Sequence, residues 1–166
     1  MLYMVLLGGN HPMAKIEVHD VVFINCDDIH RSHDKLRELW FGDKNRVHID
    51  SWMAVYGVDG YRVDLSSDPI RSDGQRLFFV NLGGYITEQF GEEHRYLLIV
   101  AENEEHAKQR AKQTVSDIWN KPHKDNLFEI DDCLTIDKVD GLYVNLTKAP
   151  HEKNQFANDY TPLLLM

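Results

Sequence analysis

Two short motifs combine an acidic residue with a histidine at a spacing that could support chemistry. Glu17 and His19 are two residues apart, and Glu92 and His94 repeat this spacing. Alternate side chains of a β-strand share one face, so each motif places a carboxylate beside an imidazole. Such a pair could act as a general acid and base, or it could provide two ligands for a divalent metal ion.

Other polar residues near these motifs are further candidates. Asp20 follows His19 directly and adds a second carboxylate to the first motif. His48 and Asp50 show the same two-residue spacing at the start of a later predicted strand, although Glu129 replaces His48 in the second half of the chain. The simpler structural interpretation is a hydrogen-bonded pair at the entrance of a strand. Because no known metal-ligand spacing occurs, we assign no metal ion, no cofactor and no catalytic residue.

Two glycine pairs, Gly8-Gly9 and Gly83-Gly84, follow short apolar runs. Glycine lets the backbone approach a ligand closely, so Gly8 and Gly9 are candidate ligand-binding residues, with Lys15 nearby as a partner for an anion. A glycine pair at the end of a strand is more often a bulge or a turn. Both interpretations remain open at this stage.

These motifs belong to an internal repeat. A shift of 75 residues places Leu2–Gly9 on Leu77–Gly84 without a gap, and a shift of 81 residues places Val58–Leu65 on Val139–Leu146. A fixed period indicates two copies of one structural unit. We therefore predict two tandem repeats that are related by a pseudo-two-fold axis.

Each repeat is predicted to fold as β-β-α-β-β, with an Asp-Gly hairpin turn before its last strand. The first repeat is expected to have strands at 2–7, 18–26, 47–56 and 61–65 and a helix at 29–41. The second is expected to have strands at 77–82, 94–101, 128–137 and 142–147 and a helix at 104–119. Helical spacing marks the buried side chains as Leu36, Leu39, Trp40, Ala107, Ala111, Val115, Ile118 and Trp119.

The predicted fold class is α+β, with mainly antiparallel sheets that are each covered by one helix. The first strand of each repeat is apolar on both faces, which favours a central position and the strand order 2-1-3-4. The opposite face of each sheet would pack against the other repeat, and one continuous eight-stranded sheet remains an alternative. The expected divisions are a first repeat at 1–67, a linker at 68–76, a second repeat at 77–149 and a C-terminal tail at 150–166.

Composition narrows the classes of protein. A hydrophobic content of 43% and a charged content of 27% are typical of a globular chain. The net charge of −9 disfavours nucleic acid as a partner, because phosphate groups would be repelled. No apolar run is long enough to cross a membrane, and the two cysteines form no disulfide or zinc pattern. We expect a cytoplasmic protein without a membrane or nucleic-acid partner.

Several motifs taken together resemble a known family. The opening Leu-Gly-Gly is followed by Ile16–Val21, Leu39–Gly42, His48–Ser51 and Val58–Tyr61. This combination is similar to a bacterial family known only as a domain of unknown function, number 1543. The resemblance covers the first repeat nearly throughout and the second repeat more loosely. It implies a bacterial source, but it implies no activity and assigns no catalytic residue.

Two functional hypotheses follow. The first is a small cytoplasmic binding or protein-interaction module without catalytic activity, which could form a homodimer through its apolar end, Pro162–Met166. The alternative is an enzyme or a metal-dependent small-ligand binder that uses Glu17, His19 and Asp20. In that case Glu92 and His94 would form a second or degenerate site.

Overall fold

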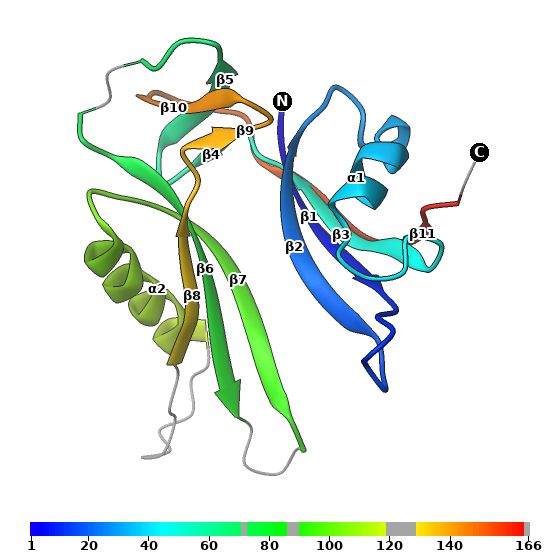
Figure 1. The fold of residues 1–166 in the computed structure, drawn as a ribbon. Helices are drawn as coiled ribbons and strands as arrows, with labels where there is room; N and C mark the ends of the chain where they lie inside the picture. The colour runs from blue at the N-terminus through cyan, green and yellow to red at the C-terminus, as the bar shows by residue number, and fades with distance from the viewer. Residues whose placement is uncertain (71–72, 86–89, 119–128, 165–166) are drawn as a thin grey trace.

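The structure is a computed structural model that describes residues 1–70, 73–85, 90–118 and 129–164 (Figure 1). It confirms an α+β fold with mainly antiparallel strands. The elements in chain order are β1 (Leu2–Gly9), β2 (Val18–Asn25), the 3₁₀ turn η1 (Ile29–Arg31), α1 (His33–Leu39), β3 (Val47–Ala54), β4 (Gly57–Val58), β5 (Tyr61–Ser66), β6 (Arg76–Tyr85), β7 (Glu92–Ala101), α2 (Glu104–Ile118), β8 (Glu129–Thr135), β9 (Lys138–Val139), β10 (Leu142–Lys148) and β11 (Gln155–Pro162).

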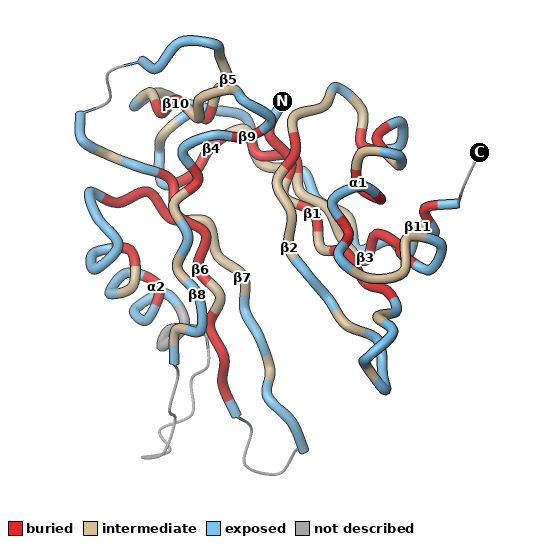
Figure 2. Tube along the Cα trace, viewed as in Figure 1, coloured by how far each residue is buried: buried red, intermediate tan, exposed pale blue. Residues whose placement is uncertain are grey.

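Two of the three sheets have the predicted first strands at their centres. One sheet has the order β11-β3-β1-β2, and another has the order β7-β6-β8. β1 and β6 therefore each lie between two antiparallel neighbours. This position explains why both strands are apolar on both faces, since neither face is left to solvent. Figure 2 shows the buried residues that run along β6.

The fourth strand of each predicted repeat was misplaced. β5 and β10 pair antiparallel with each other in a third sheet, of order β4-β5-β10-β9. The order 2-1-3-4 is therefore wrong in its last member, and in the first sheet β11 lies beside β3 instead. A single continuous sheet is also wrong for the described residues. Pairing of β5 with β10 buries Val63 and Leu146 in a core that both halves share.

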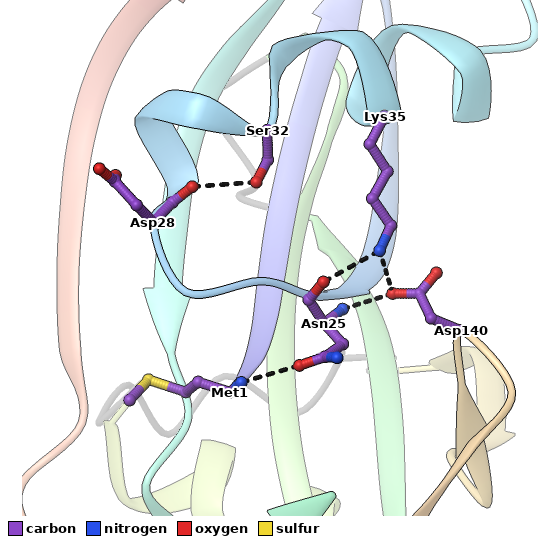
Figure 3. A network of polar contacts seen from close by, with 6 residues as sticks. All are labelled: Met1, Asn25, Asp28, Ser32, Lys35 and Asp140. Carbon is purple, nitrogen blue, oxygen red and sulfur yellow. Dashed lines mark hydrogen bonds and ion pairs between the residues drawn. The ribbon is translucent and has the colours of Figure 1, made fainter.

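One hairpin turn of each half reaches the other half. Asp140 and Gly141 have φ values of 53° and 80°, as a tight turn requires, which confirms the predicted turn. One carboxylate oxygen of Asp140 accepts hydrogen bonds from the backbone N–H of Asn25 and from Lys35 Nζ, both at 2.5 Å (Figure 3). The turn that precedes β10 therefore holds the end of β2 and the helix α1.

The matching turn makes the reciprocal contact. Asp59, with φ of 53°, accepts a hydrogen bond from the backbone N–H of Val100 at 2.8 Å and pairs with Arg110 of α2 at 3.1 Å. Val100 lies near the end of β7, as Asn25 does at the end of β2. The hairpin turn of each half thus contacts the end of a strand and a helix of the other half.

Three apolar cores follow from this arrangement. One lies between α1 and the first sheet, and a second lies between α2 and the β7-β6-β8 sheet. The third core is shared by both halves, and in it Phe23 contacts the edge of Phe79 with ring centroids 5.6 Å apart. The two halves therefore pack against each other through this shared core, while the pseudo-two-fold relation between them stays a prediction.

The helix predictions are only partly correct. The first helix is divided into η1 and α1, and Asp28 accepts a hydrogen bond from the N–H of His30. Because α1 ends at Leu39, that side chain is exposed, whereas Trp40 turns into the core. In α2 the Asn103 side chain caps the first turn. The structure buries Ala107 and Ala111, while Trp119 and the side chains of Val115 and Ile118 lie outside its described part. In the described ranges, neither α-helix has the length and the apolar run that crossing a membrane requires.

The C-terminal segment packs against its own chain. β11 pairs with β3, and Leu163 is 2% exposed in the core beneath α1, where its N–H bonds the Val47 carbonyl at 3.0 Å. Leu164 is 69% exposed, and Leu165 and Met166 lie outside the described residues. Because Leu163 is buried in its own chain, this side chain is not available for contact with a second copy. The homodimer itself stays a prediction.

We expect Leu163→Ala to lower the free energy of unfolding by about 2–3 kcal/mol, because it leaves a cavity in a packed core. The exposed neighbour provides a matched control, and Leu164→Ala should change stability by less than about 0.5 kcal/mol. Urea unfolding of both variants measures the difference. Equal stabilities would contradict the docked position of the tail.

We expect Asp59→Gly to destabilise the fold by about 1–3 kcal/mol, because Val100 loses its hydrogen-bond acceptor and Arg110 loses its partner. Glycine accepts the positive φ, so the backbone of the turn is not strained by this change. Asp59→Asn retains an oxygen acceptor and should lose less. Thermal and urea unfolding measure the order, and a larger loss for Asn would refute the assigned role of the carboxylate.

Candidate functional site

The site is built around Gly8, near the end of β1. In the two strand pairings of β1, Gly8 lies opposite His19 of β2 and opposite His48 of β3. Residues directly opposite each other in antiparallel strands share a face of the sheet. The sheet therefore places one imidazole on each side of Gly8, a residue that has no side chain.

A β-bulge adds the carboxylate of Asp50. Leu6 pairs with Ser51 and Leu7 pairs with Ile49, which leaves Asp50 as the extra residue of β3. A bulge re-aims a side chain that would otherwise alternate to the opposite face. Asp50 thereby reaches both histidines: Oδ1 lies 3.2 Å from His48 Nε2, and Oδ2 lies 3.2 Å from His19 Nε2.

Glu17 completes the cluster from the loop before β2. Its Oε1 atom lies 2.6 Å from His48 Nε2, so one ring nitrogen faces two carboxylates. The side chain of His48 is only 9% exposed, whereas those of Glu17 and His19 are about half-exposed. Asp50 Oδ2 is buried and accepts no well-formed hydrogen bond from the described residues, although His19 Nε2 lies 3.2 Å away. We call Glu17, His48 and Asp50 site I.

The donor atoms of site I surround the place of the missing side chain. A Cβ atom on Gly8 would lie 2.5 Å from Asp50 Oδ2, 2.6 Å from His48 Nε2 and 2.7 Å from Glu17 Oε1. One donor atom of each residue lies within 4.8 Å of the others. One nitrogen and two oxygen atoms that converge on one point form a donor set suited to a divalent metal ion.

The C-terminal strand supports this cluster. β11 has an irregular register against β3 between Asn158 and Thr161. The ring of Tyr160, which lies in this stretch, packs on the ring of His48 with centroids 4.2 Å apart. The stacking restricts the imidazole of His48 to one orientation, so the tail segment contributes to the geometry of site I.

The second half carries a matching cluster, Glu92, His94 and Asp131, which we call site II. Its ligand atoms also lie within 4.8 Å of one another. The register of β6 against β8 shifts between Asn81 and Leu82, so that Asp131 is again the extra residue. A Cβ atom on Gly83 would clash with Glu92 and would lie 2.6 Å from Asp131 Oδ2.

The structure gives the residues of the first predicted pair different partners, whereas Glu92 and His94 of the second pair lie together in site II. Glu17 contacts His48 and His19 contacts Asp50, so both motif residues bind side chains of β3. Asp20 lies outside site I, and its carboxylate accepts the N–H of the next residue, Val21.

The glycine pair is neither a turn nor a bulge. Gly8 and Gly9 continue β1, so the expected strand end at Leu7 is wrong. Gly8 borders site I, whereas a Cβ on Gly9 would collide with the Arg46 carbonyl, so Gly9 allows a close backbone approach.

The sequence indicates His48 and Asp50 as candidates, but it does not show that they lie beside Glu17 and His19. Asp131 was missed, although it aligns with Asp50 at the 81-residue shift. The available signal was that the residue pair Ile-Asp recurs at this shift. The extra residue in the strand could not be read from the sequence, because a bulge breaks the alternation on which a face assignment depends.

Comparison with known proteins agrees with this fold. The chain is similar to the crystal structure of a protein, Il1583 from Idiomarina loihiensis, with 31% sequence identity and a TM-score of 0.73. The similarity covers 98% of this chain and 96% of that chain. Residues 14–65 match the family Domain of Unknown Function (DUF1543). The match places residues 14–65 in this family. The DUF1543 match contains all of site I and ends before site II, and no curated protein matches the chain.

We expect Gly8→Ala to be tolerated better than Gly9→Ala. The new methyl group at Gly8 meets the ends of three side chains, which can move apart, whereas at Gly9 it meets the backbone carbonyl of Arg46. Urea unfolding of the two variants should show the larger loss of stability for Gly9→Ala. The reverse order would mean that the cluster above Gly8 is rigidly fixed.

Proposed function

We propose that the protein is a binding module that takes up a divalent transition-metal ion at site I and presents it to a small ligand. The observation that carries the proposal is the convergence of Glu17 Oε1, His48 Nε2 and Asp50 Oδ2 on the open position above Gly8.

The polar atoms of site I are under-satisfied, which supports the proposal. A buried carboxylate oxygen without a well-formed hydrogen bond is unfavourable. Asp50 Oδ2 is in that state among the described residues, with only the contact to His19 Nε2 at 3.2 Å. The nearest nitrogen of His48 can direct only one N–H bond, although two carboxylates lie beside it. A bound cation would satisfy all three groups at once, with neutral imidazole and ionised carboxylates as its ligands.

The donor set favours a first-row transition metal. Imidazole is typical of zinc, iron, copper and nickel sites, and carboxylates accompany it in many zinc and iron centres. Three protein ligands leave at least one coordination position free for water or for a ligand. Glu17 is half-exposed, so an ion at site I would be reachable from solvent.

A pocket between the two halves lies along the same face of β1 as Gly8. It has a volume of about 230 Å³, and its lining includes Leu6 and Ser51 from the first half and His94 and Tyr96 from the second, but none of the three residues of site I. Leu6 lies two residues before Gly8, on the same face of β1. Burial raises the pKa of the Tyr96 hydroxyl, and the negative charge of Asp20 raises it further, so this group stays protonated.

The proposal includes the duplication of one unit. Both sites use a glycine in the first strand, a Glu before or at the start of the second strand, and an Asp at a bulge in the third strand. Such a match in register supports a pseudo-two-fold relation between the halves. The reciprocal contacts of Asp59 and Asp140 support it independently.

Calorimetric titration with Zn²⁺ tests the proposal. We expect the parent protein to bind Zn²⁺, and His48→Ala to weaken binding at site I by about tenfold or more, because one ligand is lost. Gly8→Ala should weaken it as well, since its methyl group occupies the position of the ion. His106→Ala, a change at an exposed histidine of α2, should bind like the parent. Unchanged binding in His48→Ala would refute the proposal.

A further inference from the structure

We infer that site II is a second, independent metal site, and that it prefers a harder cation, such as Mn²⁺, more strongly than site I does. The inference depends on Glu92, His94 and Asp131, which come from β7 and β8 of the second half. It does not require an ion at site I, because the two sites share no residue.

The backbone prepares site II in the same way as site I. Gly83 leaves the space between the donor atoms free, and the extra residue in β8 turns Asp131 toward it. His94 Nδ1 lies 3.3 Å from Asp131 Oδ2, close to the 3.2 Å between His19 Nε2 and Asp50 Oδ2. The aspartate of both sites therefore has the same origin in strand register, whereas His94 of site II corresponds to His19 and not to His48.

A neighbouring amide orients the histidine of site II. Asn81 Oδ1 lies 3.2 Å from His94 Nδ1, and the Asn81 amide nitrogen donates a hydrogen bond to Asp132 Oδ2 at 3.2 Å. Asp132 thus directs the carbonyl oxygen of Asn81 toward the ring. Because Asn81 Oδ1 can only accept a hydrogen bond, it favours the tautomer with the proton on Nδ1, which leaves Nε2 of His94 as the nitrogen that can bind an ion.

The two sites differ at one decisive position. His48 pairs with Gly8 in the first half, and Glu129 pairs with Gly83 in the second. The first half therefore has two imidazoles around its glycine, His48 in site I and His19 beside it, whereas site II has one imidazole and a further carboxylate on the same face of the sheet. Carboxylate-rich sets suit Mn²⁺, Mg²⁺ and Ca²⁺, and imidazole favours the later transition metals.

Solvent access differs in the same direction. The side chain of His94 is 39% exposed, compared with 9% for His48, whereas the two aspartates are similar, at 30% for Asp131 and 26% for Asp50. Harder cations usually keep several water ligands, so they tolerate an open site. The ring of Tyr160 covers His48, and β8 has no matching strand beside it in the described sheet.

The experiment isolates site II by removing site I. In a Glu17→Gln, His48→Ala background, a Mn²⁺ titration followed by electron paramagnetic resonance should show one bound ion. Adding Glu92→Gln should weaken Mn²⁺ binding by about tenfold or more. Glu93→Gln is the matched control, because it removes the same charge from the next residue, which points to the opposite face of β7, and it should leave binding unchanged.

Each outcome decides one part of the inference. No Mn²⁺ binding in the background, or equal effects of Glu92→Gln and Glu93→Gln, would overturn site II, provided that circular dichroism shows folded protein. The preference is tested by the ratio of Zn²⁺ to Mn²⁺ affinity, which should be about tenfold or more lower at site II than at site I. An equal ratio would overturn the preference. Failure of Zn²⁺ binding at site I would leave the Mn²⁺ result unaffected.

Discussion

The pairing of β5 with β10 is the constraint on which the rest of the molecule depends. These strands belong to different halves, yet they form the centre of one sheet and contribute Val63 and Leu146 to the shared core. Their hairpin turns then place the carboxylates of Asp59 and Asp140 against the strand ends and helices of the opposite half. Because the contact is reciprocal, neither half can move without breaking backbone-directed hydrogen bonds of the other. The two large sheets are consequently fixed with their inner faces toward each other at one end.

Both clusters lie away from this junction, where β1 and β6 approach their ends (Figure 1). The packing that stabilises the fold is thus separated from the residues that could bind a ligand, and the apolar residues of the central strands give way to glycine. A glycine in the interior of a strand is normally unfavourable, since it packs nothing and loses backbone freedom on folding. At Gly8 and Gly83 the same absence of a side chain makes room between carboxylates and imidazole. At these two positions a cluster of polar side chains takes the place of apolar packing.

The sequence predicted the local elements better than their assembly. The internal repeat located β1, β2, β6 and β7 together with the Asp-Gly turns, because apolar runs and turn residues act over a few positions. The repeat could not show that β5 pairs with a strand of the other half. That pairing with β10 depends on contacts between residues about 80 positions apart, such as Val63 with Leu146. The same limit applies to site I. Glu17 and His19 could be recognised as a motif, whereas their contacts with His48 and Asp50 needed the register of three strands and one extra residue.

The contacts that each hairpin makes with the opposite half also bear on how the two halves of the chain associate during folding. Asn145 is buried, and it binds the N–H of Ile70, the hydroxyl of Ser66 and the carbonyl of Asp68, so the start of the segment between the halves is held against β10. This connection keeps the two halves at a high effective concentration and makes an association that would be bimolecular for separate pieces into an intramolecular one. A polypeptide that contained only one half would expose the apolar face of its hairpin, and a second identical polypeptide could supply the missing strand. The covalent connection between the halves therefore does what the association of two identical subunits would do in a homodimer.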